Sequence, residues 1–230
     1  MTMIPDDDSL FYYSEAGKIA SVILKKGSSL IEIGNRVLET VESIEQLVEE
    51  QGCGLAFPLN LSFNEDAAHD TASADEQRIF SEGDVVKLGL GVHLEGYIAD
   101  TAVTVDLGDN ALLIEASKAA LTKAIEIVRP GVTSGDLGRA IQHEIQVRGY
   151  HPVSNLTGHG LARYSIHTPP SIPNISFHGG VVLEEGMVFA IEPFASTGSG
   201  RVSEKNRIEI FQQTAVKPVR LPSARKLLES

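Results

Sequence analysis

The same order of helices and extended segments occurs twice in this sequence, and this restricts the folds open to it. In each half, two segments with helical periodicity precede an extended run, over residues 9–26, 29–50 and 55–62 and again over residues 115–128, 137–147 and 152–156. Such a repeat is typical of an internal duplication of a helix–helix–strand unit. We therefore predict an α+β fold in which two similar halves share one curved sheet, with helices outside and a concave cleft inside.

Capping and turn residues give the expected ends of these elements. Ser9 is a candidate N-cap of the first helix, and Gly27 is expected to end that helix. Between the halves the sequence indicates a β-hairpin, because the apolar residues 85–93 and 97–105 flank a Glu95-Gly96 turn. Further strands are expected over residues 187–194 and 207–212, and a basic helix is expected to begin at Pro222.

Composition and charge exclude some classes of partner and location. The formal net charge of −12 argues against a nucleic-acid partner, which requires clustered Lys and Arg. The sequence has no apolar run that could span a membrane, and residues 1–8 lack the basic and apolar regions of a secretion signal. Cys53 is the only cysteine and cannot form an internal disulfide, so we expect a cytoplasmic protein.

Three polar side chains occur where buried strands should be apolar. Asp100 interrupts the strand over residues 97–105, Glu192 interrupts the strand over residues 187–194, and His159 lies between two glycines that allow close backbone approach. An ionised carboxylate is costly to bury unless it is paired or binds a metal. Two acids and one imidazole from separate strands are a suitable ligand set for a divalent metal ion.

Each of these residues also has an ordinary structural interpretation. A single Asp in a strand, such as Asp100, is more often a hairpin-end or salt-bridged residue than a metal ligand. A histidine between glycines, such as His159, is a weak functional signal by itself. Spacing and composition alone therefore leave both interpretations open.

Four segments resemble, in the correct order, the motifs of the type II methionine aminopeptidases of archaea and eukaryotes. The segments read AFPLNLSFNE followed by AAH (residues 56–69), GVHLEGYIADTA (91–102), NLTGH with IH (155–167) and GMVFAIEPF (186–194). The resemblance covers roughly residues 9–228 and implies the pita-bread fold, with two pseudo-symmetric halves around a curved, mainly antiparallel sheet. It implies a catalytic domain over residues 1–202 that lacks the final strand, followed by the start of the type II helical insert over residues 203–230.

The resemblance implies a particular set of metal ligands. Members of the family hold two divalent metals through two Asp, one His and two Glu, and the ion could be Co, Mn, Fe or Zn. Asp100 is implied to bridge both metals, and His159 and Glu192 are implied to complete the shell of the first. The implied reaction is hydrolysis of the first peptide bond, with the metals acting as Lewis acids.

The resemblance also assigns four residues to the substrate. His69 and His167 are implied to be catalytic residues that contact the substrate's N-terminal residue or the scissile peptide group. Phe57 and Ile166 are implied to line the pocket that accepts the methionine side chain. On the sequence alone, His69 would be a core-edge histidine and His167 an exposed loop residue, and the other two would be ordinary core residues.

The sequence departs from the family pattern at one metal position. The family has an aspartate where this chain has Gly89, and glycine has no side chain with which to bind a metal. Positions 89 and 100 lie symmetrically about a Leu94-Glu95 turn, so we expect them to face each other across the hairpin on one side of the sheet. The nearest acids in sequence are Asp84 and Glu95, and neither is expected to reach this place.

A second departure lies at the C-terminal end. The family's last bridging glutamate follows a long helical insert, and this sequence ends at Ser230, within the first helix of that insert. Glu209 precedes the insert, so we do not expect it to replace the missing ligand. Because the second metal would keep only Asp100, we expect at most one metal per chain, held by Asp100, His159 and Glu192.

These observations leave more than one function open. The leading hypothesis is a metal-dependent methionine aminopeptidase that removes the N-terminal methionine from nascent proteins, impaired by the loss of two metal ligands. The alternative is a non-catalytic pita-bread protein that binds peptides or partners, as the proliferation-associated relatives do. A prolidase for Xaa-Pro bonds is a third hypothesis. The resemblance to type II motifs at Phe57-Pro58 and Ala68-His69 argues against it. We expect a monomer whose partner is the N-terminal methionine of peptides or nascent proteins, with no nucleic-acid or membrane partner.

Overall fold

An antiparallel sheet forms the centre of the first half of the molecule. The computed structural model describes residues 6–205, 208–213, 215 and 217–229. Within them, the sheet is built from strands β1 (Gly54–Leu55), β2 (Asn60–Phe63), β3 (Val85–Leu94) and β4 (Tyr97–Asp106). β3 and β4 form the predicted hairpin, and β1 and β2 both pair with the other edge of β3.

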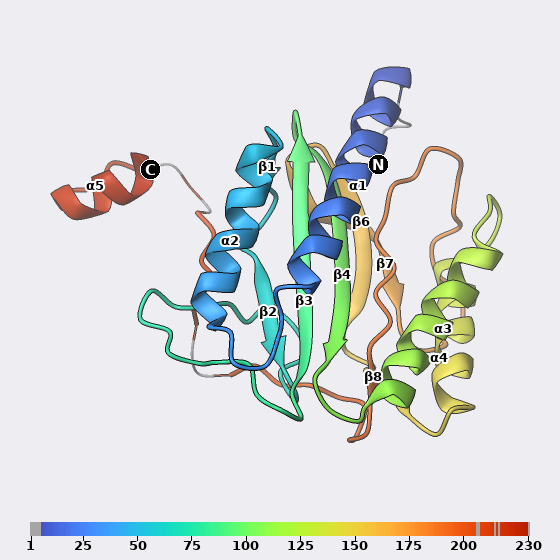
Figure 1. The fold of residues 1–230 in the computed structure, drawn as a ribbon. Helices are drawn as coiled ribbons and strands as arrows, with labels where there is room; N and C mark the ends of the chain where they lie inside the picture. Colours follow the sequence, from blue (N-terminus) through green and yellow to red (C-terminus); the bar gives the residue numbers. More distant parts are fainter. Residues whose placement is uncertain (1–5, 206–207, 214, 216, 230) are drawn as a thin grey trace.

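Helices α1 (Asp7–Ser28) and α2 (Val37–Glu50) cover one face of this sheet (Figure 1). α1 lies across β3 and β4, and α2 lies beside α1. The predicted cap of α1 is wrong, because Asp6 is the N-cap and its side chain accepts a hydrogen bond from the backbone N–H of Ser9. Ser9 therefore lies inside the first turn, where the Asp6 carboxylate satisfies its amide.

Gly27 lies within the last turn of α1 and does not end the helix, contrary to the prediction. The glycine is buried where α1 and α2 approach each other closely. A Cβ atom at this position would lie only 2.9 Å from Ile44 Cδ1 and 3.2 Å from Leu88 Cδ2. The glycine is thus explained by helix packing rather than by helix termination.

The second helix begins later than its periodicity predicts. Residues 29–36 form turns instead of helix, and the end of this segment pairs with residues 78–80. The N–H of Gly34 donates to Phe80 O (2.8 Å), the N–H of Phe80 donates to Asn35 O (3.0 Å), and the N–H of Val37 donates to Arg78 O (3.1 Å). These bonds fix the end of the loop that runs from β2 to β3.

The helix–helix–strand order returns in the second half, as the repeat predicts. Its elements are α3 (Ala111–Ile127), α4 (Ser134–Gln146), β5 (His151–Pro152), β6 (Thr157–Ala162), β7 (Ser165–Pro173) and β8 (Ala195–Ser196). β6 pairs with β7, β5 pairs with β8, and β6 contacts β4 of the first half. Figure 1 shows β6 and β7 beyond β4, with α3 and α4 on the far side of β7. Of the predicted strand over residues 152–156, only the first residue is in β5.

The segment over residues 187–194 runs along β6 without forming the predicted regular strand. Leu161 N–H donates to Val188 O (2.9 Å), Ala190 N–H donates to His159 O (2.8 Å), and a single β-bridge joins Gly160 to Phe189. No strand occurs over residues 208–212, and Arg207 lies outside the described residues. The C-terminal helix α5 (Pro222–Glu229) begins at Pro222 as predicted and lies apart from the other elements in Figure 1.

The register of the hairpin differs from the predicted one by two residues. Gly91 pairs with Asp100 and Gly89 pairs with Ala102, because the turn is centred on Glu95-Gly96. Both turn residues have left-handed backbones, with φ of 52° and 88°, which is the geometry of a two-residue hairpin loop. Gly89 and Asp100 thus share one side of the sheet, as expected, but are diagonal neighbours rather than directly opposed.

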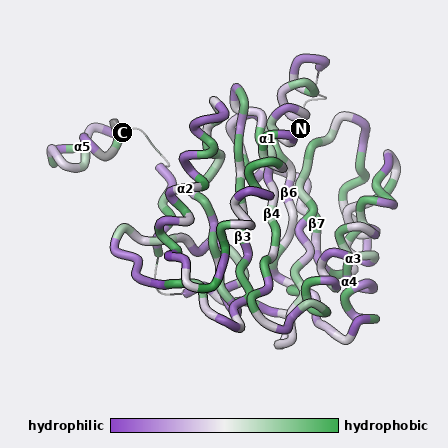
Figure 2. Tube along the Cα trace, in the orientation of Figure 1, coloured by the Kyte–Doolittle hydropathy of each residue, from purple (hydrophilic) through white to green (hydrophobic). Residues whose placement is uncertain are grey.

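The core is divided between the two halves. The larger cluster lies between α1, α2 and the first sheet, and smaller clusters lie under α3 and α4. Figure 2 shows hydrophobic stretches along the strands and on the helices. None of the helices in the described part of the chain is long and apolar enough to cross a bilayer.

Candidate metal centre

Asp100, His159 and Glu192 lie together between the two halves of the molecule. One possible ligand atom from each side chain lies within 4.8 Å of those of the other two. His159 Nε2 lies 3.4 Å from Asp100 Oδ2 and 2.9 Å from Glu192 Oε1. Asp100 comes from β4, His159 from β6 and Glu192 from the segment beside β6, so the grouping depends on the tertiary fold.

Glycines bring the backbones of this site close together. A Cβ atom at Gly158 would lie 2.2 Å from Ala190 O, and one at Gly160 would lie 2.2 Å from Pro169 O. Gly158 thus lets β6 approach the segment that carries Glu192, and Gly160 lets β6 approach β7, in keeping with the close backbone approach that the sequence predicts for these glycines. On β3, a Cβ atom at Gly91 would lie 2.2 Å from Phe57 Cε1, so the Phe57 ring packs over the residue that faces Asp100.

The electrostatics of His159 favour a cation at its Nε2 atom. His159 Nδ1 lies 3.2 Å from Gly160 O, where a proton on Nδ1 can be donated to the carbonyl. Nε2 then faces two carboxylates, and an uncharged lone pair there would be unfavourable. Burial disfavours the charged imidazole, but Asp100 and Glu192 outweigh burial and raise the pKa of His159 to about 10 with only protein atoms around it.

The donor set fits a divalent metal ion. Glu192 Oε1 is buried and, apart from its ion pair with His159, has no hydrogen-bond partner among the described residues. A buried carboxylate oxygen in this state is expected to have a proton or a metal as its partner. One imidazole nitrogen and two carboxylates suit Mn, Fe, Co or Zn and leave positions open for water and substrate.

Space remains beside Asp100, at Gly89. Apart from its chain neighbours, the nearest atom to a Cβ built at Gly89 is Asn60 Cβ, at 3.3 Å. Asn60 is the partner of Gly89 across β2 and β3, and its Nδ2 donates to Pro58 O (3.2 Å). Asn60 Oδ1 is buried without a hydrogen-bond partner among the described residues. The residue that faces Gly89 across β2 and β3 thus carries an unsatisfied oxygen.

Two further histidines extend from the cluster. The ring centroid of His167 lies 4.4 Å from that of His159 and 6.5 Å from that of His69, and the His69 and His167 side chains are accessible to solvent. Partial burial and the neighbouring His159 and His69 lower the pKa of His167. His167 is thus uncharged near neutral pH and can donate or accept one hydrogen bond. Ile166 directly precedes it in β7 and is half-buried.

Sequence reasoning did not single out Asn60 or Arg78. Asn60 lies within a segment that resembles the family, but only the strand register shows that it neighbours Gly89. Arg78 pairs with Asp70 and Glu76, and the pair with Asp70 forms only when the loop between β2 and β3 folds back on itself. Polar residues in an extended run are the only sequence signal for either.

Two similar helix-containing halves, with an Asp, a His and a Glu brought together between them, define the pita-bread fold of metallopeptidases. The chain belongs to metallopeptidase family M24, whose family model matches residues 12–217. The methionine aminopeptidase of Archaeoglobus fulgidus is 48% identical over 97% of this chain and 77% of that protein. The methionine aminopeptidase of Pyrococcus horikoshii is 49% identical over 93% of this chain and 73% of that protein. The crystal structure of a methionine aminopeptidase from Thermotoga maritima superposes with a TM-score of 0.84 at 29% identity and covers 90% of this chain and 87% of that one.

Proposed function

We propose that this protein is a metal-dependent methionine aminopeptidase that removes the N-terminal methionine from nascent proteins. The observation that carries the proposal is the convergence of Asp100, His159 and Glu192 on one point. Relatives named methionine aminopeptidase, which match nearly the whole chain, support this activity over others of the same family. We further propose that residues 1–202 are the catalytic domain, that residues 203–230 begin a helical insert, and that the protein acts as a cytoplasmic monomer without nucleic-acid or membrane partners.

In this proposal, Asp100, His159 and Glu192 hold the ion. A bound divalent ion supplies Lewis-acid chemistry that polarises the carbonyl of the first peptide bond. His167, which is uncharged and lies beside His159, donates a hydrogen bond to the scissile peptide group. His69, whose ring centroid lies 6.5 Å from that of His167, contacts the substrate's N-terminal residue.

The proposed pocket for the methionine side chain is lined by Phe57 and Ile166. The Phe57 ring packs over Gly91, directly opposite Asp100, so an apolar wall adjoins the ligand cluster. Ile166 adjoins His167 in β7. A flexible, apolar methionine side chain suits such a wall.

We propose that the chain binds no more than one ion tightly. Gly89 contributes no carboxylate, and Asp84 and Glu95 do not replace it: Asp84 accepts from Ser81 and Asn64, and Glu95 lies in the hairpin turn. Fewer charged ligands offset less of the cost of removing water from the ion, so affinity is lower than with a second carboxylate.

A non-catalytic pita-bread protein that binds peptides or partners is the second candidate, and Gly89 is the observation that favours it. The two functions differ in whether free methionine is released. We expect purified protein to release methionine from Met-Ala-Ser when Mn²⁺ or Co²⁺ is added, and His159→Ala to abolish release. Absence of release at every metal concentration, from protein shown to contain the ion, would reject the enzyme and favour the binding protein.

A further inference from the structure

The backbone around His69 is held in an unusual conformation by its neighbours. His69 lies in the loop between β2 and β3 and has a left-handed backbone, with φ of 62°. Such a conformation is uncommon outside glycine and persists only where the surroundings enforce it. The His69 ring has no hydrogen bond to another described residue, so its place depends on how the loop is anchored.

The loop is anchored directly after His69. The N–H of Leu61 donates to Asp70 O (2.7 Å), and the N–H of Asp70 donates to Ser62 Oγ (3.2 Å). The hydroxyl of Thr71 donates to Leu59 O (2.7 Å). Through these bonds the two residues after His69 are fixed against the start of β2, which lies beside Gly89 on β3.

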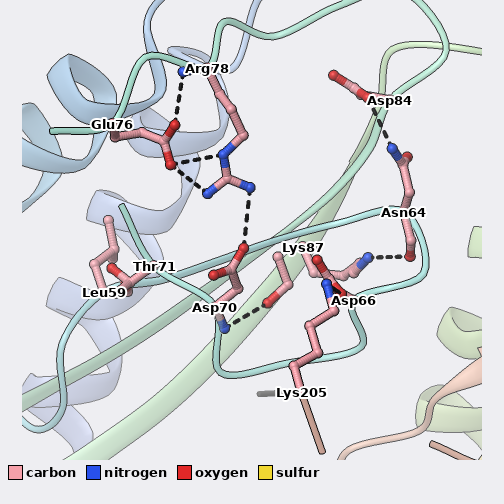
Figure 3. Close-up of polar contacts among 11 residues, drawn as sticks. Leu59, Asn64, Asp66, Asp70, Thr71, Glu76, Arg78, Asp84, Lys87 and Lys205 are labelled. Carbon is pink, nitrogen blue, oxygen red and sulfur yellow. Dashed lines mark hydrogen bonds and ion pairs between the residues drawn. The ribbon is translucent and has the colours of Figure 1, made fainter. Parts of the chain in front are cut away.

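Arg78 closes this loop on itself, as Figure 3 shows. Its Nη1 lies 3.2 Å from Asp70 Oδ2, and its Nε and Nη2 both lie 2.8 Å from Glu76 Oε2. The backbone N–H of Arg78 donates to Glu76 Oε1 (2.8 Å), and the guanidinium carbon lies 4.8 Å from the centroid of the Phe63 ring. The guanidinium thus contacts Glu76 through Nε and Nη2, Asp70 through Nη1 and the ring of Phe63.

The positive charge of Arg78 is needed to keep the two carboxylates of Asp70 and Glu76 close together. Glu76 is only 8% exposed, and although burial opposes its charged form, hydrogen bonds from Arg78 lower the pKa of Glu76. Without the guanidinium, the Asp70 and Glu76 carboxylates would repel each other across the closed loop. A partly buried, hydrogen-bonded ion pair of this kind is more rigid than an exposed one.

We propose that Arg78 is a positioning residue that fixes His69 for the substrate by anchoring the carboxylate of Asp70. This inference rests on the proposed function, in which His69 contacts the substrate. Arg78 does not touch the substrate or the ion in this account and acts only through the loop.

A double-mutant cycle on methionine release tests the proposal. We expect Arg78→Met to lower kcat/KM about tenfold or more, because small displacements of a substrate-contacting group are costly. In a His69→Ala background the same substitution should cause no further loss, since Arg78 acts through His69. Arg78→Lys, which keeps the charge but not the bidentate fork, should recover part of the activity. Equal losses in the two backgrounds would overturn the proposal.

The control for general loss of an ion pair is Lys123→Met. Lys123 pairs with Glu126 on the exposed surface of α3, at 3.1 Å, far from the loop in sequence. We expect this variant to match the unsubstituted protein. Where Arg78→Met does not fold, as judged by its thermal transition, Asp70→Asn replaces it, because it weakens only the link between the guanidinium and the loop.

A spectroscopic measurement separates this proposal from the proposed function. In protein labelled at histidine ring carbons, we expect Arg78→Met or Asp70→Asn to shift the His69 signals. The signals of His143 on α4 and His151 in β5 should not change. This measurement needs no activity, so a protein that releases no methionine still tests the anchoring of His69. Unchanged His69 signals would overturn it.

Discussion

Gly89 lies beside the metal site without contributing a ligand. It lies on the same side of the sheet as Asp100, two residues along the hairpin from the direct partner of Asp100, Gly91. The space above it is bounded by Asn60, whose Oδ1 atom is buried without a partner among the described residues. A carboxylate placed here would add a possible oxygen ligand beside Asp100.

Gly89→Asp is expected to increase metal binding. Its Cβ atom would lie 3.3 Å from Asn60 Cβ, so a shift of a few tenths of an ångström accommodates it. We expect at least about tenfold tighter binding of Mn²⁺, because one more charged ligand offsets the dehydration of the ion. Isothermal titration measures this, and Gly89→Ala is the matched control, with the same Cβ and no carboxylate. Equal affinities for the two variants would contradict the account.

Lys87 lies two residues before Gly89 on β3 and makes a pH-dependent contribution to the stability of the folded protein. Burial lowers the pKa of Lys87 to about 8, although Asp66 and Glu65 oppose the shift, and its Nζ donates to Asn64 O (2.7 Å). Between about pH 8 and pH 10.4, the unfolded chain therefore binds more protons at this group than the folded protein does. The contribution of Lys87 to stability consequently rises with pH through this window.

The difference in unfolding free energy between the unsubstituted protein and Lys87→Met measures the contribution of Lys87 to stability. We expect the difference to change in favour of lysine by about 2 kcal/mol at most as the pH rises from 7.5 to 10. Urea unfolding at several pH values measures it. A difference that stays constant, or that falls with pH, would show that the folded protein does not disfavour the charged lysine.

At the scale of elements, packing and loop contacts determine where some helices begin and end, which local sequence patterns do not predict. The hairpin, the repeated helix–helix–strand order and the helix at Pro222 follow from local periodicity and turn residues. Residues 29–36 also have helical periodicity, but the backbone groups of Gly34 and Asn35 bond to Phe80, which is distant in sequence. Gly27 reads as a helix stop because sequence alone does not show that Ile44 packs against it.

In the candidate site, too, the sequence predicts the residues that take part but not how the strands pair around them. The residue types of Asp100, His159 and Glu192 could be chosen from the sequence, because charge in an apolar strand is a local signal. The two-residue error in the register of Gly89 arose because a hairpin's pairing depends on which residues take positive φ, here Glu95 and Gly96.

Gly158 tests whether the approach of β6 to residues 187–194 sets the position of Glu192. A Cβ atom at Gly158 would lie 2.2 Å from Ala190 O, so Gly158→Ala must push this segment away. We expect a loss of about 2–4 kcal/mol in unfolding free energy and weaker metal binding. Gly17→Ala is the control, since nothing lies within 4 Å of a Cβ at that position in α1. This control should be neutral or stabilising by up to about 1 kcal/mol. Similar effects of the two substitutions would contradict the role given to Gly158.

At the scale of the whole molecule, the ligand cluster joins the two halves. Asp100 belongs to the first sheet, whereas His159 and Glu192 belong to the second half, and β4 contacts β6 beside them. An ion bound by all three side chains would hold the halves together and favour the folded protein.

Thermal unfolding should therefore depend on the concentration of metal. At an ion concentration of about 100 times Kd, we expect stabilisation of about 2.7 kcal/mol, and treatment with a chelator should reverse it. Asp100→Asn and His159→Ala should remove the dependence, although they come from different halves. A shift that persists in both variants would place the stabilising ion elsewhere.

The most direct test of the account is the number of Mn²⁺ ions bound per chain, measured by titration of the protein and its His159→Ala and Glu192→Gln variants. The account predicts one tightly bound ion per chain, with affinity reduced about 100-fold or more in either variant, because each removes one of three ligands. Two tightly bound ions, or binding that neither substitution weakens, would contradict the claim that Asp100, His159 and Glu192 share a single ion.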